Sequence, residues 1–183
     1  MKPSQFAKSA VAAAVISVAA LGAQATTTDL GTVAINVPTS FGGFAGVGGF
    51  MDYFTFILPA NGGSGYSVAN FAPVGIGSSF NTILSSLALV SNPDGILFNT
   101  DDMLVTSSTI PGGVSIGMTW GASMGGNMYL VVSGVTNGSA GGLYTGAVSV
   151  TAVPEPETYA MFLAGLGIMG AIAARRNKAK KQG

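Results

Sequence analysis

Five aspartates are the only acidic or basic side chains between residues 26 and 152: Asp29, Asp52, Asp94, Asp101 and Asp102. This stretch contains no Lys, Arg or His, and the whole chain contains no Cys. A general base or nucleophile built here would be a carboxylate or a hydroxyl, with no imidazole or amine beside it to tune or activate it. We therefore expect a non-enzymatic protein without a cofactor. An Asp-based hydrolase stays open as an alternative, and it requires two carboxylates about 5–10 Å apart in a cleft.

The acidic tetrapeptide Asn99–Asp102 raises the question of calcium, which is bound by carboxylate and carbonyl oxygens. Calcium loops alternate their ligands along the chain, whereas Asp101 and Asp102 are adjacent, and no further acidic residue follows to complete the coordination shell. We interpret the segment as a solvated turn and expect no metal site.

Aromatic residues at strand spacing suggest a second alternative, a carbohydrate-binding module for exopolysaccharide. Aromatic rings stack on the apolar faces of sugars, and the candidates are Tyr53, Tyr66, Trp120, Tyr129 and Tyr144. Single aromatics at this spacing are more often core residues, so packing is the preferred interpretation. Nucleic acid is excluded as a partner of this region, because it offers no cation to neutralise phosphates.

Alternating apolar and polar residues predict about seven or eight short strands in residues 26–152, forming an all-β, antiparallel β-sandwich, with a jelly-roll arrangement left open. The densest aromatic segment, Phe50–Leu58, predicts a central strand. Asp52 lies on its aromatic side, and we expect it to cap turn amides or to stay solvated at a sheet edge.

The other elements are expected as follows. Thr32–Val37 and Tyr66–Phe71 are predicted to be strands, and the glycine-rich Phe41–Gly49 a loop or an irregular edge strand. Hairpins are expected to pair Ser79–Val90 with Gly95–Phe98, across the turn Asn92–Gly95, and Val114–Trp120 with Met128–Val135. The last strand is Leu143–Ala152.

The N-terminal segment has the pattern of a signal peptide over residues 1–25. Lys2 and Lys8 precede the apolar segment Ser9–Leu21, and the small residues Ala23 and Ala25 suit the pockets of a signal peptidase. We expect signal peptidase to cleave after Ala25.

The C-terminal segment, 153–183, combines a proline-containing motif at 153–157, an uncharged apolar run over 158–174 and a basic tail over 175–183. This order predicts a single transmembrane helix over 158–174 that holds the protein transiently in the inner membrane. Basic residues after the apolar run are expected to keep the tail cytoplasmic.

Pro154, Glu155 and Pro156, followed by the apolar run and by Arg175 and Arg176, closely resemble the PEP-CTERM sorting signal of Gram-negative bacteria. The resemblance implies that an exosortase recognises the Pro-Glu-Pro motif and removes the anchor before release to the cell surface or an exopolysaccharide matrix.

A second resemblance concerns Phe50, Asp52 and Phe54, which look like the motif of the FxDxF subgroup of these proteins. That subgroup implies no biochemical activity.

Overall fold

The structure, a computed structural model, describes residues 24–60, 62–73, 75, 79–121, 125–152 and 156–180. Ala23 and most of the predicted signal peptide lie outside the described residues, as do Pro154 and Glu155. Contacts divide the chain into two compact units, one ending at Ala152 and the other beginning at Val153.

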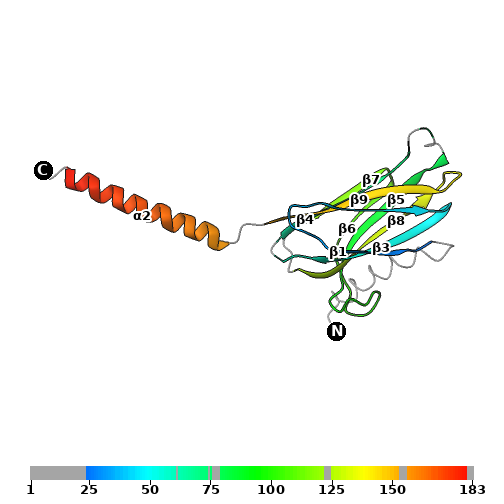
Figure 1. Cartoon of the computed structure of the whole chain (residues 1–183), viewed down its shortest axis with the longest axis horizontal. Coiled ribbons are helices and arrows are strands. Elements are labelled where there is room, and N and C mark those ends of the chain that lie inside the picture. Colours follow the sequence, from blue (N-terminus) through cyan, green and yellow to red (C-terminus); the bar gives the residue numbers. More distant parts are fainter. Residues whose placement is uncertain are drawn as a thin grey trace. The chain divides into compact units, whose positions relative to one another are not determined.

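The first unit is a β-domain in which the described strands form two sheets (Figure 1). One sheet has five strands in the order β1-β3-β8-β5-β6, and the other has four in the order β2-β9-β4-β7. The strands are β1 Thr27–Thr32, β2 Thr39–Ala45, β3 Gly48–Leu58, β4 Gly62–Asn70, β5 Thr82–Ser91, β6 Met103–Gly113, β7 Ser115–Trp120, β8 Gly126–Thr136 and β9 Gly142–Ala152.

Successive strands mostly alternate between the two sheets, and among those described only β5 and β6 are consecutive and paired. The orders β2-β9-β4-β7 and β3-β8-β5-β6 follow the pattern of an eight-stranded jelly roll. All pairs within these eight strands are antiparallel. The predicted sandwich of antiparallel sheets is thus present, and β1 is an addition to it.

β1 departs from the antiparallel prediction because it runs parallel to β3 at the edge of the five-stranded sheet. A parallel neighbour cannot follow from a tight hairpin and requires a long connection. Here the chain crosses to the other sheet as β2 before it returns as β3.

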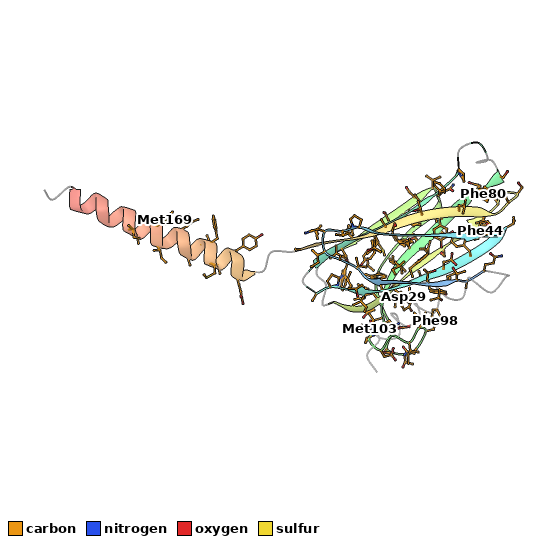
Figure 2. All side chains as sticks on the ribbon, viewed as in Figure 1. Asp29, Phe44, Phe80, Phe98, Met103 and Met169 are labelled. Carbon is orange, nitrogen blue, oxygen red and sulfur yellow. The ribbon has the colours of Figure 1, made fainter. Side chains whose placement is uncertain are left out.

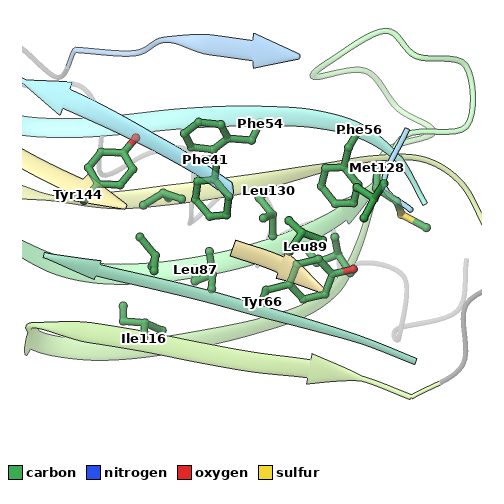
Figure 3. Packing of buried hydrophobic residues seen from close by; sticks show 14 of the residues in the cluster. Phe41, Phe54, Phe56, Tyr66, Leu87, Leu89, Ile116, Met128, Leu130 and Tyr144 are labelled. Carbon is green, nitrogen blue, oxygen red and sulfur yellow. The ribbon is translucent and has the colours of Figure 1, made fainter. Parts of the chain in front are cut away.

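The core lies between the sheets, where apolar side chains of both inner faces meet (Figure 3). β3 contributes Phe50, Phe54, Phe56 and Leu58, all at most 3% exposed. Its alternation of buried and less buried positions is what a strand with one face in the core requires. The outer face is only partly covered, since Ile57 is 46% exposed.

Several predicted strand boundaries are wrong. The strand predicted at Thr32–Val37 is absent, because β1 ends at Thr32. Of the apolar residues that follow, Val33 is buried in the core and Ile35 is exposed. The glycine-rich segment Phe41–Gly49, expected to be a loop or an irregular edge strand, divides between two regular strands: its first part belongs to the edge strand β2, which ends at Ala45, and Gly48 and Gly49 begin β3. In β2, Phe41 packs over Gly146 of β9, where the Cβ of any other residue would collide with the ring.

Both predicted hairpins are wrong, the first because its second strand begins later in the chain and the second because the chain crosses between sheets. The turn at Asn92–Gly95 is present, with the Gly95 amide donating to the Asn92 carbonyl, but the segment after it is a loop and β5 pairs with β6. β7 and β8 are consecutive yet belong to different sheets. Local turn residues do not reveal whether a chain returns along the same sheet or crosses to the other.

The second unit contains helix α2, Pro156–Lys180. Proline suits the first helical turn, and Glu157 complements the helix dipole there. The helix runs past the predicted end at residue 174, because Ala, Arg and Lys are good helix formers. Its apolar side chains are exposed, including Met161, Phe162 and Leu163. Within the described residues, no helix is both long and apolar enough to cross a membrane, so the predicted transmembrane helix over 158–174 is not supported.

Two tyrosine hydroxyls are buried in the core and satisfied there. Tyr66 donates to the Ser64 hydroxyl at 2.9 Å, and Tyr144 donates to Asp52. Burial is the main cause that raises the pKa of Tyr66, to about 12, with an opposing contribution from Ser64. Burial likewise raises the pKa of Tyr144, and the bond to Asp52 and its charge raise it further.

We predict that Leu130→Ala lowers the free energy of unfolding by about 2–5 kcal/mol, because Leu130 is fully buried in the central strand β8 and its loss leaves a cavity. The matched control is Val135→Ala on the same strand, where the side chain is 45% exposed and the expected loss is below about 1 kcal/mol. Urea unfolding followed by the single Trp120 measures both. Equal losses would contradict the assignment of the two faces of β8.

We also predict that the domain loses stability in alkali. The unfolded chain ionises its tyrosines near pH 10, whereas the folded domain keeps Tyr66 and Tyr144 protonated to higher pH. Stability is therefore full below about pH 10 and falls as the pH rises towards 12. Phenolate absorbance measures the ionisation of these tyrosines, and circular dichroism measures the loss of the fold. We expect the two signals to change together over the same pH range. Ionisation of all tyrosines near pH 10 with the fold intact would contradict this.

Candidate functional site

The structure places the five aspartates in three different settings. Asp29 is exposed on β1 and accepts hydrogen bonds from the Gly31 amide and the Thr55 hydroxyl. Asp94, Asp101 and Asp102 follow β5 in one loop, and Asp94 accepts from the Ile96 amide and the Asn99 side chain. Asp52 is the exception, because it is only 2% exposed and lies on the inner face of β3.

One of the two predicted settings of Asp52, solvation at a sheet edge, is therefore wrong. Its Oδ1 accepts from the backbone nitrogen of Thr26 at 2.9 Å and from the Thr26 hydroxyl at 2.6 Å. Its Oδ2 accepts from the Tyr144 hydroxyl of the opposite sheet. The other expectation, that it caps turn amides, is wrong as well, because the backbone amide it accepts belongs to Thr26, which lies directly before β1 and not in a turn. Three donors satisfy the carboxylate, and all of them are neutral.

These settings bear on the hydrolase alternative. Asp52 faces the core, whereas Asp102 lies over the outer face of the same sheet, so the sheet separates them. The described residues contain no group of three or more His, Cys, Asp or Glu side chains that could hold a metal ion. Asp94 and Asp102 accept hydrogen bonds from loop groups, and Asp102 also from Tyr129 on β8.

A hollow of about 120 Å³ lies on the outer face of the five-stranded sheet. It forms because outward positions of four neighbouring strands are apolar and the loop after β5 folds over them. Its lining residues are Met51, Tyr53, Ala88, Val90, Phe98, Asn99, Asp102, Leu104, Tyr129 and Val131.

Three aromatic rings form one side of this hollow. Tyr53 packs edge-on against Phe98 with ring centroids 4.7 Å apart, and Tyr129 lies 6.3 Å from Tyr53 and 6.1 Å from Phe98. Tyr129 is buried, whereas Phe98 is 53% exposed and lies in the loop over the sheet (Figure 2). Phe98 has a φ of 66°, in the left-handed region that bulky residues avoid.

The polar side of the hollow comes from Asp102 and Asn99. Asp102 Oδ2 accepts from the Phe98 amide at 2.7 Å and from the Tyr129 hydroxyl at 3.1 Å. Burial and the Asp102 charge raise the pKa of Tyr129, so its hydroxyl remains a donor. Burial and the charge of Asp52 raise the pKa of Tyr53. Asp102 Oδ1 and Asn99 Oδ1 are buried acceptors without a hydrogen-bond partner in the described structure.

This arrangement can bind a small group that presents both an apolar face and hydrogen-bond donors. The rings would contact the apolar face, and the Tyr129 hydroxyl, Asn99 and Asp102 make one side of the lining polar. The volume is below the 300–1,000 Å³ of ordinary small-molecule pockets, so only one ring or one side chain of a larger ligand would enter.

The predicted aromatic set is divided by the structure. Tyr66, Tyr129 and Tyr144 are buried, which agrees with their interpretation as core residues, while Tyr53 and Trp120 are partly buried. Phe98, the exposed ring of the hollow, was expected to lie in a strand. Three consecutive apolar residues, Ile96, Leu97 and Phe98, inside a polar loop are the available signal for a loop that covers a sheet.

The other predicted site residues are only partly described. Phe50 and Phe54 lie on the inner face of β3 on either side of Asp52. Ala25 is exposed, one residue before Thr26. Helix α2 includes Pro156, Arg175 and Arg176.

Comparisons with known proteins identify the C-terminal segment. A family profile described as the PEP-CTERM protein-sorting motif matches residues 152–177. No curated protein matches the chain. Among solved structures, the pre-peptidase C-terminal domain of a collagenase from Bacillus anthracis has 18% sequence identity, covers 70% of this chain and 96% of its own, and has a TM-score of 0.34. A TM-score this low supports no conclusion about fold or function.

The profile does not extend to the β-domain, so the FxDxF subgroup stays a prediction. The chain carries a PEP-CTERM sorting motif, which implies an exported protein that an exosortase processes at a membrane.

Proposed function

We propose that this chain is a non-enzymatic component of the cell envelope or extracellular matrix, sorted and cleaved by an exosortase and released as its β-domain. The match of the sorting motif to residues 152–177 carries the proposal. The motif begins where β9 ends at Ala152, so cleavage in this segment would leave every described strand intact. The FxDxF assignment of Phe50, Asp52 and Phe54 is part of the same proposal.

The non-enzymatic role is supported by what surrounds the carboxylates. Asp52 is committed to three hydrogen bonds in the core, and Asp29 and Asp94 hold nearby backbone and side-chain groups. A general acid or base needs access to a substrate proton at hydrogen-bonding distance. The described settings of these aspartates favour a structural use.

The sorting proposal predicts the mass of the mature protein. Intact-mass measurement of protein recovered from the producing cell should give a form without residues 159–181, because exosortase acts at the Pro-Glu-Pro motif. Glu155→Ala should preserve the full C-terminal segment. Glu157→Ala, which alters the neighbouring glutamate outside that triplet, is the matched control and should be processed normally. A wild-type protein that retains residues 159–181 would contradict cleavage.

A second candidate function, binding of exopolysaccharide, is supported by the hollow beside Phe98. An exposed aromatic ring beside a hollow with a polar side is a combination that can stack on the apolar face of a sugar ring. The domain would then bind the matrix into which it is released.

This candidate predicts that exopolysaccharide purified from the producing cell retains the wild-type protein and that Phe98→Ala loses most of that retention. Phe71→Ala is the matched control, because Phe71 is 50% exposed and does not line the hollow. Retention of Phe98→Ala at the wild-type level, or no retention of the wild type, would remove this candidate.

A further inference from the structure

Thr26 is the first residue after the predicted signal-peptidase site, and it is the residue that bonds to the buried carboxylate. Its backbone nitrogen lies 2.9 Å from Asp52 Oδ1, and its hydroxyl lies 2.6 Å from the same oxygen. Thr26 itself is exposed, whereas Asp52 is 2% exposed. The end of the mature chain would therefore sit at the surface with its nitrogen directed at an interior charge.

The β-domain has no cation of its own for this charge. Residues 26–152 contain no Lys, Arg or His. A buried carboxylate is costly unless it is paired as well as hydrogen-bonded. Among the residues that the structure describes, the donors to Asp52 in the uncleaved chain are an amide and two hydroxyls.

We propose that cleavage after Ala25 supplies the missing cation: the α-ammonium group of Thr26 forms an ion pair with Asp52 that exists only in the processed protein. Water hydrolyses the amide between Ala25 and Thr26. The carboxylate of Ala25 leaves with the signal peptide, and the Thr26 nitrogen becomes a protonated amine. The proposal rests on the proposed function, because export is what brings the chain to signal peptidase.

The rest of the β1 region stays in place after such a cut. Tyr53 donates its amide to the Thr26 carbonyl at 2.8 Å, and β1 remains paired with β3 from Thr27 onward. What is lost is three neutral hydrogen bonds of exposed Gln24, to Gly49, Met51 and Gly46. Cleavage thus removes neutral hydrogen bonds at the surface and creates one charge-assisted hydrogen bond to a buried group. A charge-assisted hydrogen bond is stronger than a neutral one.

The pairing makes stability depend on pH. Two titratable groups lie near Asp52 in the described structure: Tyr144 from β9 bonds to it, and Tyr53, its chain neighbour on the outer face of β3, is influenced by its charge. Both stay neutral because their pKa values are raised. A paired α-ammonium keeps its proton to higher pH than the α-amino group of the unfolded chain, which titrates near 7.7–8.0. The added stability is full below that range and is lost as the pH rises through the higher pKa of the folded state.

The test compares three chains that are identical through Gly183. One begins at Thr26, one begins at Ala25, and one begins at an Nα-acetylated Thr26. At pH 6.5 we expect the chain with free Thr26 to have a Tm higher than either other chain by roughly 5 °C. At pH 9.5 its advantage over the acetylated chain should shrink. Equal Tm values at pH 6.5 would overturn the proposal.

Asp52→Asn should abolish the difference between the free and acetylated chains, because the pair loses its anion. Asp29→Asn removes an exposed carboxylate of the neighbouring strand β1 and should leave the difference unchanged. If Asp52→Asn does not fold, the free and acetylated wild-type chains decide the question alone.

N-terminal sequencing of the exported protein completes the test, with Thr26 expected as its first residue and any other first residue overturning the proposal. These measurements concern only the N-terminus. Failure here therefore leaves the C-terminal mass measurement, and with it the sorting proposal, independently testable.

Discussion

The contact between the inner face of β3 and the strands β2 and β9 is the one on which the domain depends. The Phe41 and Phe54 rings lie 4.6 Å apart, and Phe50 stacks on Tyr144 at 5.2 Å. Between them Asp52 accepts the Tyr144 hydroxyl across the two sheets. Apolar packing tolerates small slips, but a buried carboxylate with a fixed donor does not, so this bond selects one register between the sheets.

The shortage of cations explains how the rest of the polar chemistry is arranged. Several buried polar groups in this domain are satisfied by hydroxyls and backbone groups, as with Tyr66 and Ser64 or the Thr82 hydroxyl and the Leu143 carbonyl. Exposed aspartates accept nearby amides and organise turns instead of forming ion pairs. The described carboxylate contacts therefore serve the fold first.

Period-two alternation made most strands predictable, because a strand with one face in a core must repeat every second residue. Phe50–Leu58 and Leu143–Ala152 lie within β3 and β9 for that reason. Pairing was not predictable from turns: β7 and β8 belong to different sheets, and β1 is parallel to β3. The setting of Asp52 was missed because its donors are 26 and 92 residues away in sequence. The hollow depends on how the loop after β5 folds over the sheet, which short-range patterns do not determine.

The position of β9 has a mechanical consequence. β9 is bonded on both sides, to β2 and to β4, and its last residue, Ala152, is followed directly by the sorting segment. A pull on the C-terminal side along the direction of the strand loads the β4 ladder, which reaches Ala152, in shear, and between Gly142 and Val148 it loads the β2 ladder as well. An edge strand could be peeled away one bond at a time, whereas a strand bonded on both sides along much of its length resists as a unit. The domain is therefore firmly held at the end that leads into the sorting segment.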